Sequence, residues 1–149
     1  MPRVLEIVPK GTWPAPAADH ITLDQDARHR RRILLTSDSG VACLLDLPHA
    51  VQMRHGDALL LDDDRLVEIL AAAEDLLEIR ADSPEHLLKL AWHLGNRHLA
   101  AQVQADRILI RHDRVIAQML ENLGATVARV SLPFDPEGGA YGGGHHAHG

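Results

Sequence analysis

Histidines are the residues whose type and spacing in this chain favour chemistry. The sequence has 11 of them beside only 2 Trp, 1 Tyr and 1 Phe. Two lie in the hexapeptide HLGNRH (93–98), where a helical pattern ends, and three lie close together near the carboxyl end, at His145, His146 and His148. Short histidine-rich tracts are a recognised metal-binding composition. The composition therefore indicates proton or metal chemistry.

The two histidines of HLGNRH do not have the spacing of a helical chelating pair. His93 and His98 are five positions apart with Gly95 between them, whereas the H-E-x-x-H zinc motif places its histidines at i and i+4. His93 shares a polar helix stripe with His86 and Lys89, for which simple solvation is the plainer interpretation. His98 is either a metal ligand or a histidine that complements the helix dipole.

His112 is a further candidate, at the end of the strand-like run RILIRH (107–112). It stands directly before Asp113, and strand alternation places it on the side of Ile108 and Ile110. It is therefore either a histidine at the edge of the core or a second metal ligand, with an adjacent carboxylate that could orient its ring.

Two charged runs predict no site. RHRRR (28–32) could meet a phosphate or an acidic partner, but a solvated loop before a strand is the simpler interpretation. The acidic turn at 62–64 lacks the spaced ligands and late glutamate of a calcium loop.

The first half of the chain favours β structure. Short apolar runs separated by turn residues extend from Arg3 to about Ala72, and they predict a small all-β domain over residues 1–73. The run LVEILAAA (66–73) fits either a helix or a strand. The overall fold class is therefore α+β with two domains, because the second half has a different character.

That second half alternates strand and helix patterns. LLEIRA (76–81) is followed by a helix that Ser83 and Pro84 open and Gly95 stops, then by QVQA and RILIRH. Asp113 opens a second helix that ends at Gly124, and ATVARVSL closes the series. The order β-α-β-β-α-β predicts a ferredoxin-like domain over residues 74–134. The glycine-rich residues 135–149 predict a flexible tail.

Composition excludes several classes of protein. The start MPRVLEIVPKG lacks a signal-peptide pattern, and no apolar run is long enough to cross a bilayer, so we expect a cytoplasmic protein without membrane contact. A single cysteine, Cys43, suits a reducing compartment. The formal charge of −6 and the scarcity of aromatic residues argue against nucleic-acid binding. The signature motifs of hydrolases and nucleotide-binding enzymes are absent from the sequence, so we do not expect an enzyme.

Three motifs in this two-domain context resemble the UreE family of urease accessory proteins, which are nickel metallochaperones. They are GNRH (95–98), RHDRVI (111–116) and the tail HHAHG (145–149). The resemblance covers essentially the whole chain. It implies a homodimer joined through the ferredoxin-like domains, in which His98 of both subunits binds one nickel ion. His112 and the tail histidines would be auxiliary ligands, and zinc or copper would bind the same site.

The resemblance also implies partners. The first domain would be similar to the peptide-binding module of a co-chaperone and would dock the urease apoprotein and its accessory proteins, including the nickel-loading GTPase. In two respects the chain departs from some relatives. Arg114 stands where several have another histidine, and an arginine cannot be a ligand because it stays protonated. The tail is also short, so we expect few sites per dimer.

Two other functions remain as alternatives. An RNA-binding module would use the ferredoxin-like sheet and RHRRR, but RILIRH lacks the aromatic residues that an RNA-binding sheet presents. An acylphosphatase-like hydrolase would use Asn96 and Arg97 to hold a phosphoryl group.

Overall fold

The structure, a computed structural model, describes residues 1–138 and divides the chain into two compact units. The first unit is Met1–Ala72 and the second is Ala73–Glu137. The tail histidines His145, His146 and His148 lie outside the described residues. In the described part of the chain, neither helix is long and apolar enough to span a membrane.

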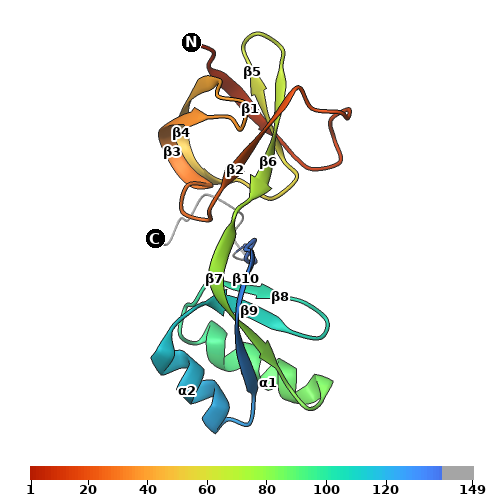
Figure 1. The fold of residues 1–149 in the computed structure, drawn as a ribbon, viewed down its shortest axis with the longest axis vertical. Coiled ribbons are helices and arrows are strands. Elements are labelled where there is room, and N and C mark those ends of the chain that lie inside the picture. Colours follow the sequence, from red (N-terminus) through yellow and green to blue (C-terminus); the bar gives the residue numbers. More distant parts are fainter. Residues whose placement is uncertain (139–149) are drawn as a thin grey trace. The chain divides into compact units, whose positions relative to one another are not determined.

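The first unit contains only strands among its described residues (Figure 1). Four of them form a sheet in the order β1-β5-β6-β2, in which β6 is antiparallel to β5 and parallel to β2. The other two, β3 and β4, form an antiparallel ribbon. The run whose type the sequence left open is a strand, β6. The bounds are β1 Val4–Val8, β2 Asp19–Leu23, β3 His29–Thr36, β4 Ala42–Gln52, β5 Ala58–Leu61 and β6 Leu66–Ala71.

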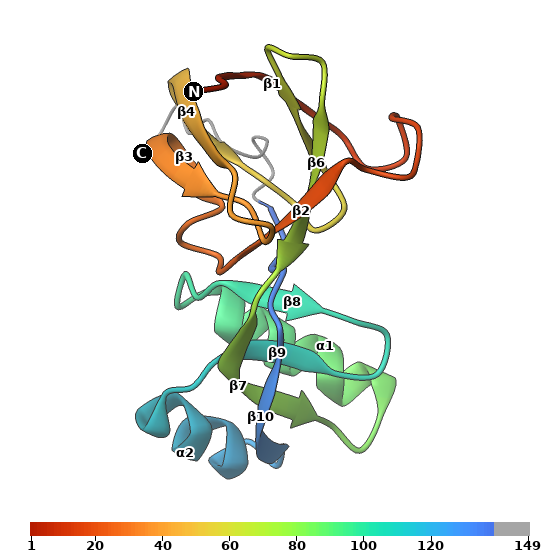
Figure 2. The same ribbon diagram turned by 45° about the horizontal axis from the view of Figure 1, so that its top comes forward.

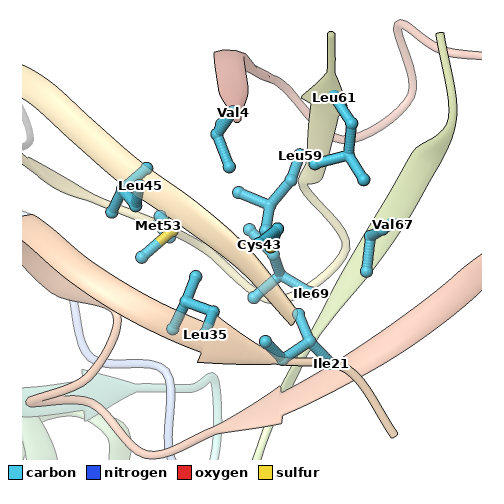
Figure 3. Close-up of a cluster of buried hydrophobic side chains, with 10 residues drawn as sticks. All are labelled: Val4, Ile21, Leu35, Cys43, Leu45, Met53, Leu59, Leu61, Val67 and Ile69. Carbon is cyan, nitrogen blue, oxygen red and sulfur yellow. The ribbon is translucent and has the colours of Figure 1, made fainter. Parts of the chain in front are cut away.

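One core of aliphatic side chains holds this unit together (Figure 3). Alternate residues of each strand face it, as in Leu59 and Leu61 of β5 and Val67 and Ile69 of β6. Burying each such side chain contributes roughly 1.5–3 kcal/mol relative to leaving it exposed. Cys43 belongs to the same core, and burial raises the pKa of its thiol.

The basic run RHRRR is not the solvated loop that the sequence suggested. Arg28 is fully buried, and its guanidinium donates hydrogen bonds to the carbonyl oxygens of Leu23 at 3.1 Å and Met53 at 3.4 Å. Residues 29–32 already belong to β3. Charged runs are usually solvated, and a buried charge persists where polar partners surround it. Here backbone carbonyls supply those partners, and carbonyls leave no mark in the sequence.

The second unit has the element order β7-α1-β8-β9-α2-β10. Its sheet has the strand order β10-β7-β9-β8, and all neighbouring strands are antiparallel. Both helices pack on one face of this sheet, where they share a core with residues of β7 and β9 (Figure 2). The bounds are β7 Ala73–Arg80, α1 Pro84–Gly95, β8 Ala101–Val103, β9 Ile108–Arg111, α2 Arg114–Asn122 and β10 Thr126–Pro133.

The two expected N-caps are confirmed. Ser83 Oγ accepts a hydrogen bond from the backbone amide of His86 at 3.0 Å. Asp113 Oδ1 accepts from the amides of Val115 at 2.9 Å and Ile116 at 3.1 Å. Each cap satisfies amides that the first turn of a helix leaves without a partner. The sequence thus predicted where both helices begin.

The buried faces of the helices are narrower than the apolar pattern suggested. Leu87, Leu90 and Leu94 of α1 are buried, but Leu88 is 72% exposed. In α2, Val115 is 75% exposed although it belongs to the apolar pattern. Part of the apolar surface of both helices therefore faces away from the core of its own unit.

The chain continues in contact with the second unit beyond β10. Phe134 is fully buried, the amide of Asp135 donates to Gln102 Oε1 at 2.9 Å, and the amide of Glu137 donates to the carbonyl of Ala101 at 2.8 Å. The sequence placed residues 135–137 in the tail, whereas the structure holds them against β8. We call residues 134–137 the anchor segment.

Candidate metal centre

His98 lies in a tight turn that follows α1. The amide of Arg97 donates to the carbonyl of Leu94, and the amide of His98 donates to that of Gly95, both at 3.1 Å. These i to i+3 bonds tighten the end of the helix and satisfy two of its last carbonyls. Leu99 then packs against the core of the unit, whereas His98 is exposed. The imidazole of His98 is therefore exposed at the surface, between the bonded end of α1 and Leu99.

The left-handed residue that terminates this region is His98 and not Gly95. We expected Gly95 to stop the helix, but it is the last helical residue and Asn96 still has helical dihedrals (φ −68°, ψ −14°). His98 has φ 56°, in the left-handed region that glycine usually occupies at helix ends. A side chain there costs roughly 1–2 kcal/mol. A histidine that bears this cost at position 98 indicates that its side chain is needed there.

His93 lies apart from this turn, on the helix. It is half-buried, and its ring makes an edge-to-face contact with Trp92 at 5.1 Å between ring centroids. Trp92 itself is 67% exposed. The interpretation of His93 as a residue of the solvated helix stripe thus needs modification, because the ring packs against an aromatic neighbour.

His86, the other histidine of that stripe, is occupied by structural contacts. Its Nε2–H donates to the carbonyl oxygen of Leu123 at 2.8 Å, and its Nδ1 lies 2.9 Å from a carboxylate oxygen of Asp82. This ring links the start of α1 to the end of α2. It is a structural residue, because both ring nitrogens already have partners.

His112 lies exposed at the junction between β9 and α2. Its amide donates to the carbonyl of Asp75 at 3.0 Å. A hydrogen bond from the Arg129 guanidinium, together with the nearby His112 ring, holds the pKa of the Asp75 carboxyl below its ordinary value. His112 is thus an exposed imidazole with a carboxylate nearby, not a core residue.

Leu99 connects the surroundings of the two histidines. A cavity of about 140 Å³ is lined by Leu99, the residue that follows His98, together with His112 and Asp113. A second cavity, of about 170 Å³, is lined by Leu99 together with Gly95 and Glu137. Leu99 therefore borders both the His112 region and the anchor segment.

Glu137 is a residue that the sequence did not bring to attention. Its carboxylate lies 3.4 Å from the amide of Val103, and its own amide is bonded to β8. No spacing or motif relates it to His98, which is 39 positions away in the sequence. Glu137 lies beside the last turn of α1, with which it lines the second cavity.

A single chain does not assemble a complete metal site from its described residues. Among residues 1–138, no group of three or more His, Cys, Asp or Glu side chains comes together with the geometry to hold an ion. The exposed imidazoles of His98 and His112 are nevertheless suitable donors for borderline divalent ions.

Sequence models of one protein family match both halves of the chain. The model described as "UreE urease accessory protein, N-terminal domain" matches residues 4–72, and its C-terminal counterpart matches residues 74–149.

Individual relatives agree with these models. The urease accessory protein UreE of Bradyrhizobium sp. (strain ORS 278) is 54% identical over 149 residues, which cover 100% of this chain and 71% of the relative. That of Beijerinckia indica subsp. indica is 50% identical over 151 residues, covering 99% of this chain and 87% of the relative. The urease accessory protein UreE 1 of Brucella suis biovar 1 (strain 1330) is 54% identical over 128 residues, covering 86% and 79%.

Proposed function

The chain belongs to the UreE family of urease accessory proteins, and from that premise we propose that it binds Ni(II) and delivers it to apo-urease during assembly of the urease active site. Nickel is the cargo in this function and not a resident cofactor. As an accessory protein, the chain is not itself an enzyme. Family membership supports this function over the RNA-binding and acylphosphatase-like alternatives.

The observation that carries the proposal is the position of His98. It is an exposed imidazole, in a backbone conformation that disfavours side chains, within a chain whose described residues supply no complete ligand set. A two-fold axis beside His98 would bring two copies to one ion, since each residue near such an axis is duplicated. We therefore propose a homodimer in which His98 of both chains binds the same nickel ion.

Exposed apolar residues on α1 support this dimer. Leu88 is 72% exposed and Trp92 67%, and their i, i+4 spacing places them on one face of the helix. Contiguous apolar surface of this kind is typical of protein interaction sites. A second copy packed over this face would bring both His98 rings near the axis.

The auxiliary ligands in this proposal are His112 and the tail histidines His145, His146 and His148. Imidazole ligands on exposed elements bind Ni(II) yet leave its coordination shell open to exchange, which a carrier requires. Zn(II) and Cu(II) would bind the same donors, and Cu(II) more tightly on the Irving–Williams order. Selectivity for nickel would therefore come from supply and from the partner proteins.

The two units would have separate tasks. We assign the second unit to the ferredoxin-like class, and the support is its split β-α-β arrangement, in which β9 lies between β7 and β8 in the sheet. It would carry the metal and form the dimer. The first unit would dock urease and its accessory proteins, including the nickel-loading GTPase, in the cytoplasm.

Nickel titration of the full chain, followed by native mass spectrometry, tests the stoichiometry. We expect the first tightly bound ion to appear on a pair of chains. One tight ion on each monomer, independent of protein concentration, would contradict the shared site. Delivery has its own test. In the presence of a weak chelator, the nickel-loaded protein should activate apo-urease faster than the same concentration of nickel salt.

A further inference from the structure

Three consecutive arginines of the first unit have no side-chain partner within residues 1–138. Arg30, Arg31 and Arg32 are exposed, and among the described residues none of them forms an ion pair or a side-chain hydrogen bond. Even Asp46, which lies opposite Arg32 in the β3–β4 register, forms no ion pair with it. In a chain with a formal charge of −6, this is a concentrated and unneutralised positive surface.

The arginines lie on a strand with an open edge. The sheet that contains β3 has only two strands, so β3 pairs with β4 on one side. For residues 30–36, the described part of the chain offers no backbone partner on the other side. An open strand edge presents unpaired amides and carbonyls, which can pair with an added strand.

Strand alternation separates the two faces of β3. Leu35 is buried in the core and Ile33 packs against it, whereas Leu34 between them is 58% exposed. Period-two alternation places Arg32 on the same outer face as Leu34, and a register shift between Arg30 and Arg32 interrupts the alternation before it. The outer face therefore combines a guanidinium group with an apolar side chain, and Arg30 and Arg31 are exposed beside it.

The beginning of β3 is held firmly. The buried guanidinium of Arg28 bonds to two backbone carbonyls, and the amide of Met53 donates to the carbonyl of Arg28 at 2.7 Å. The neighbouring arginines are thus displayed from a fixed backbone. A preorganised surface loses less conformational freedom on binding than a mobile loop would.

From these observations we propose that the outer edge of β3 docks an extended acidic segment of a partner protein, which adds to the ribbon as a further strand. Backbone hydrogen bonds to the edge would supply affinity, and carboxylates facing Arg30, Arg31 and Arg32 would supply selectivity. The occupant is an acidic peptide because three arginines outnumber the one carboxylate opposite them, Asp46, and because β3 has no aromatic residues on which nucleobases stack. This inference rests on the proposal that the first unit docks partners.

A short fluorescein-labelled peptide of alternating glutamate and valine is the probe, with full-length protein and fluorescence anisotropy as the readout. We expect binding at low salt that weakens as the salt concentration rises. The triple variant Arg30→Ser, Arg31→Ser, Arg32→Ser should bind about tenfold more weakly, since each exposed ion pair contributes a few-fold. Amide exchange of residues 30–36, measured by NMR, should slow when the peptide binds.

A matched control keeps the positive charge in place. The variant Arg30→Lys, Arg31→Lys, Arg32→Lys should weaken binding less than the serine variant does, because lysine retains the charge although it lacks the planar fork of arginine. A peptide of alternating lysine and valine should not bind. Equal weakening in both triple variants, or binding without slower amide exchange, would overturn the proposal. So would tighter binding of a uridine-rich RNA than of the acidic peptide.

A different result would show that the arginines only keep the edge from pairing with other copies. In that case the wild-type protein would not bind the peptide, and the variant with serine at positions 30–32 would oligomerise. Nickel titration of the same variant separates this inference from the proposed function. Unchanged nickel binding with lost peptide binding is the expected result, whereas failure of nickel delivery alone would leave the docking surface intact.

Discussion

The backbone amide of His98 donates a hydrogen bond to the carbonyl oxygen of Gly95 over 3.1 Å, and this bond closes a turn in which the histidine is left-handed. Glycine would adopt φ 56° without steric cost. The fold thus carries a local cost at the residue that we propose as the central nickel ligand. Such strain persists where surrounding structure fixes it, and here the helix and the half-buried Leu99, which packs against the core, do so.

Comparing His98→Gly with His98→Ala separates the fold from the metal. Both variants should lose the tightest nickel site in titration calorimetry. In urea unfolding, however, the glycine variant should be about 1 kcal/mol more stable than the alanine variant, because only alanine has a Cβ in the left-handed region. His93→Ala is the control and should retain the tight site. Wild-type nickel binding by His98→Ala would show that the central assignment is wrong.

Deleting residues 145–149 should lower the nickel stoichiometry or affinity but leave one site. The reason is that, in the proposed function, the tail supplies auxiliary imidazoles, whereas His98 remains. Calorimetry on the truncated chain measures both quantities. Complete loss of binding would place the principal site in the tail and contradict the role of His98.

The anchor segment should matter only when the tail is present. Glu137→Pro removes the amide that donates to Ala101, whereas the amide of Asp135 keeps its bond to Gln102, so the stretch from the last contact to His145 lengthens by about a quarter. Effective concentration falls roughly as the −3/2 power of tether length, so nickel affinity should fall by about 1.4-fold in the full chain. In the chain truncated before His145 it should not change.

Gly138→Pro is the matched control for that variant, because it introduces proline one residue beyond the bond to β8. It should leave nickel affinity unchanged in the full chain. If Glu137→Pro weakened nickel binding equally with and without the tail, the anchor segment would act on His98 directly and the tether account would be wrong.

Nickel affinity should fall as pH drops through about 6.5, the ordinary range of histidine. Protons and Ni(II) compete for the same imidazole nitrogens, so metal binding must release protons from ligands that are protonated. Titrations between pH 5 and pH 8 measure the slope. A flat profile over this interval would argue against imidazole coordination.

Asp19 should contribute an acid-dependent part of stability. Hydrogen bonds from the hydroxyls of Ser37 and Ser39, and from the amide of His20, lower its pKa to about 2. A lowered folded-state pKa stabilises the protein above the unfolded value of about 3.9, and this contribution is lost as pH falls toward 2.

The substitution Asp19→Asn should therefore flatten the dependence of Tm on pH between about 4 and 2. Asp62→Asn, which removes an exposed carboxylate in a turn, is the control for the loss of one negative charge. Identical pH profiles for wild type and Asp19→Asn would contradict the assigned hydrogen-bond network.

Local chemistry predicted the helix starts but not the conformation around His98. Ser83 and Asp113 cap their helices as expected, because a cap is a contact between residues two or three positions apart. The end of α1 was harder to predict, since Gly95 matched the usual stop signal and the left-handed position fell three residues later. The tight turns after Gly95 move the left-handed position to His98. Whether such turns form depends on how Leu99 packs against the core of the second unit, which is a long-range contact.

Residues that depend on long-range contacts were the ones that the sequence could not place. The buried guanidinium of Arg28 donates to the carbonyls of Leu23 and Met53, and backbone atoms carry no residue-specific signal. Glu137 reaches the end of α1 through pairing with β8. Periodicity likewise marked Leu88 as apolar without showing whether its own unit or another chain would cover it.

The anchor segment also allows the number of histidines in the tail to change easily during evolution. Since Phe134 and Glu137 hold the chain to the second unit, insertions or deletions after residue 138 would change the number of histidines without disturbing β8 or α1. With the tail histidines as the auxiliary ligands we propose, selection could therefore adjust how many ions are bound by length changes alone, while the core of the second unit and the His98 turn remain under separate constraint.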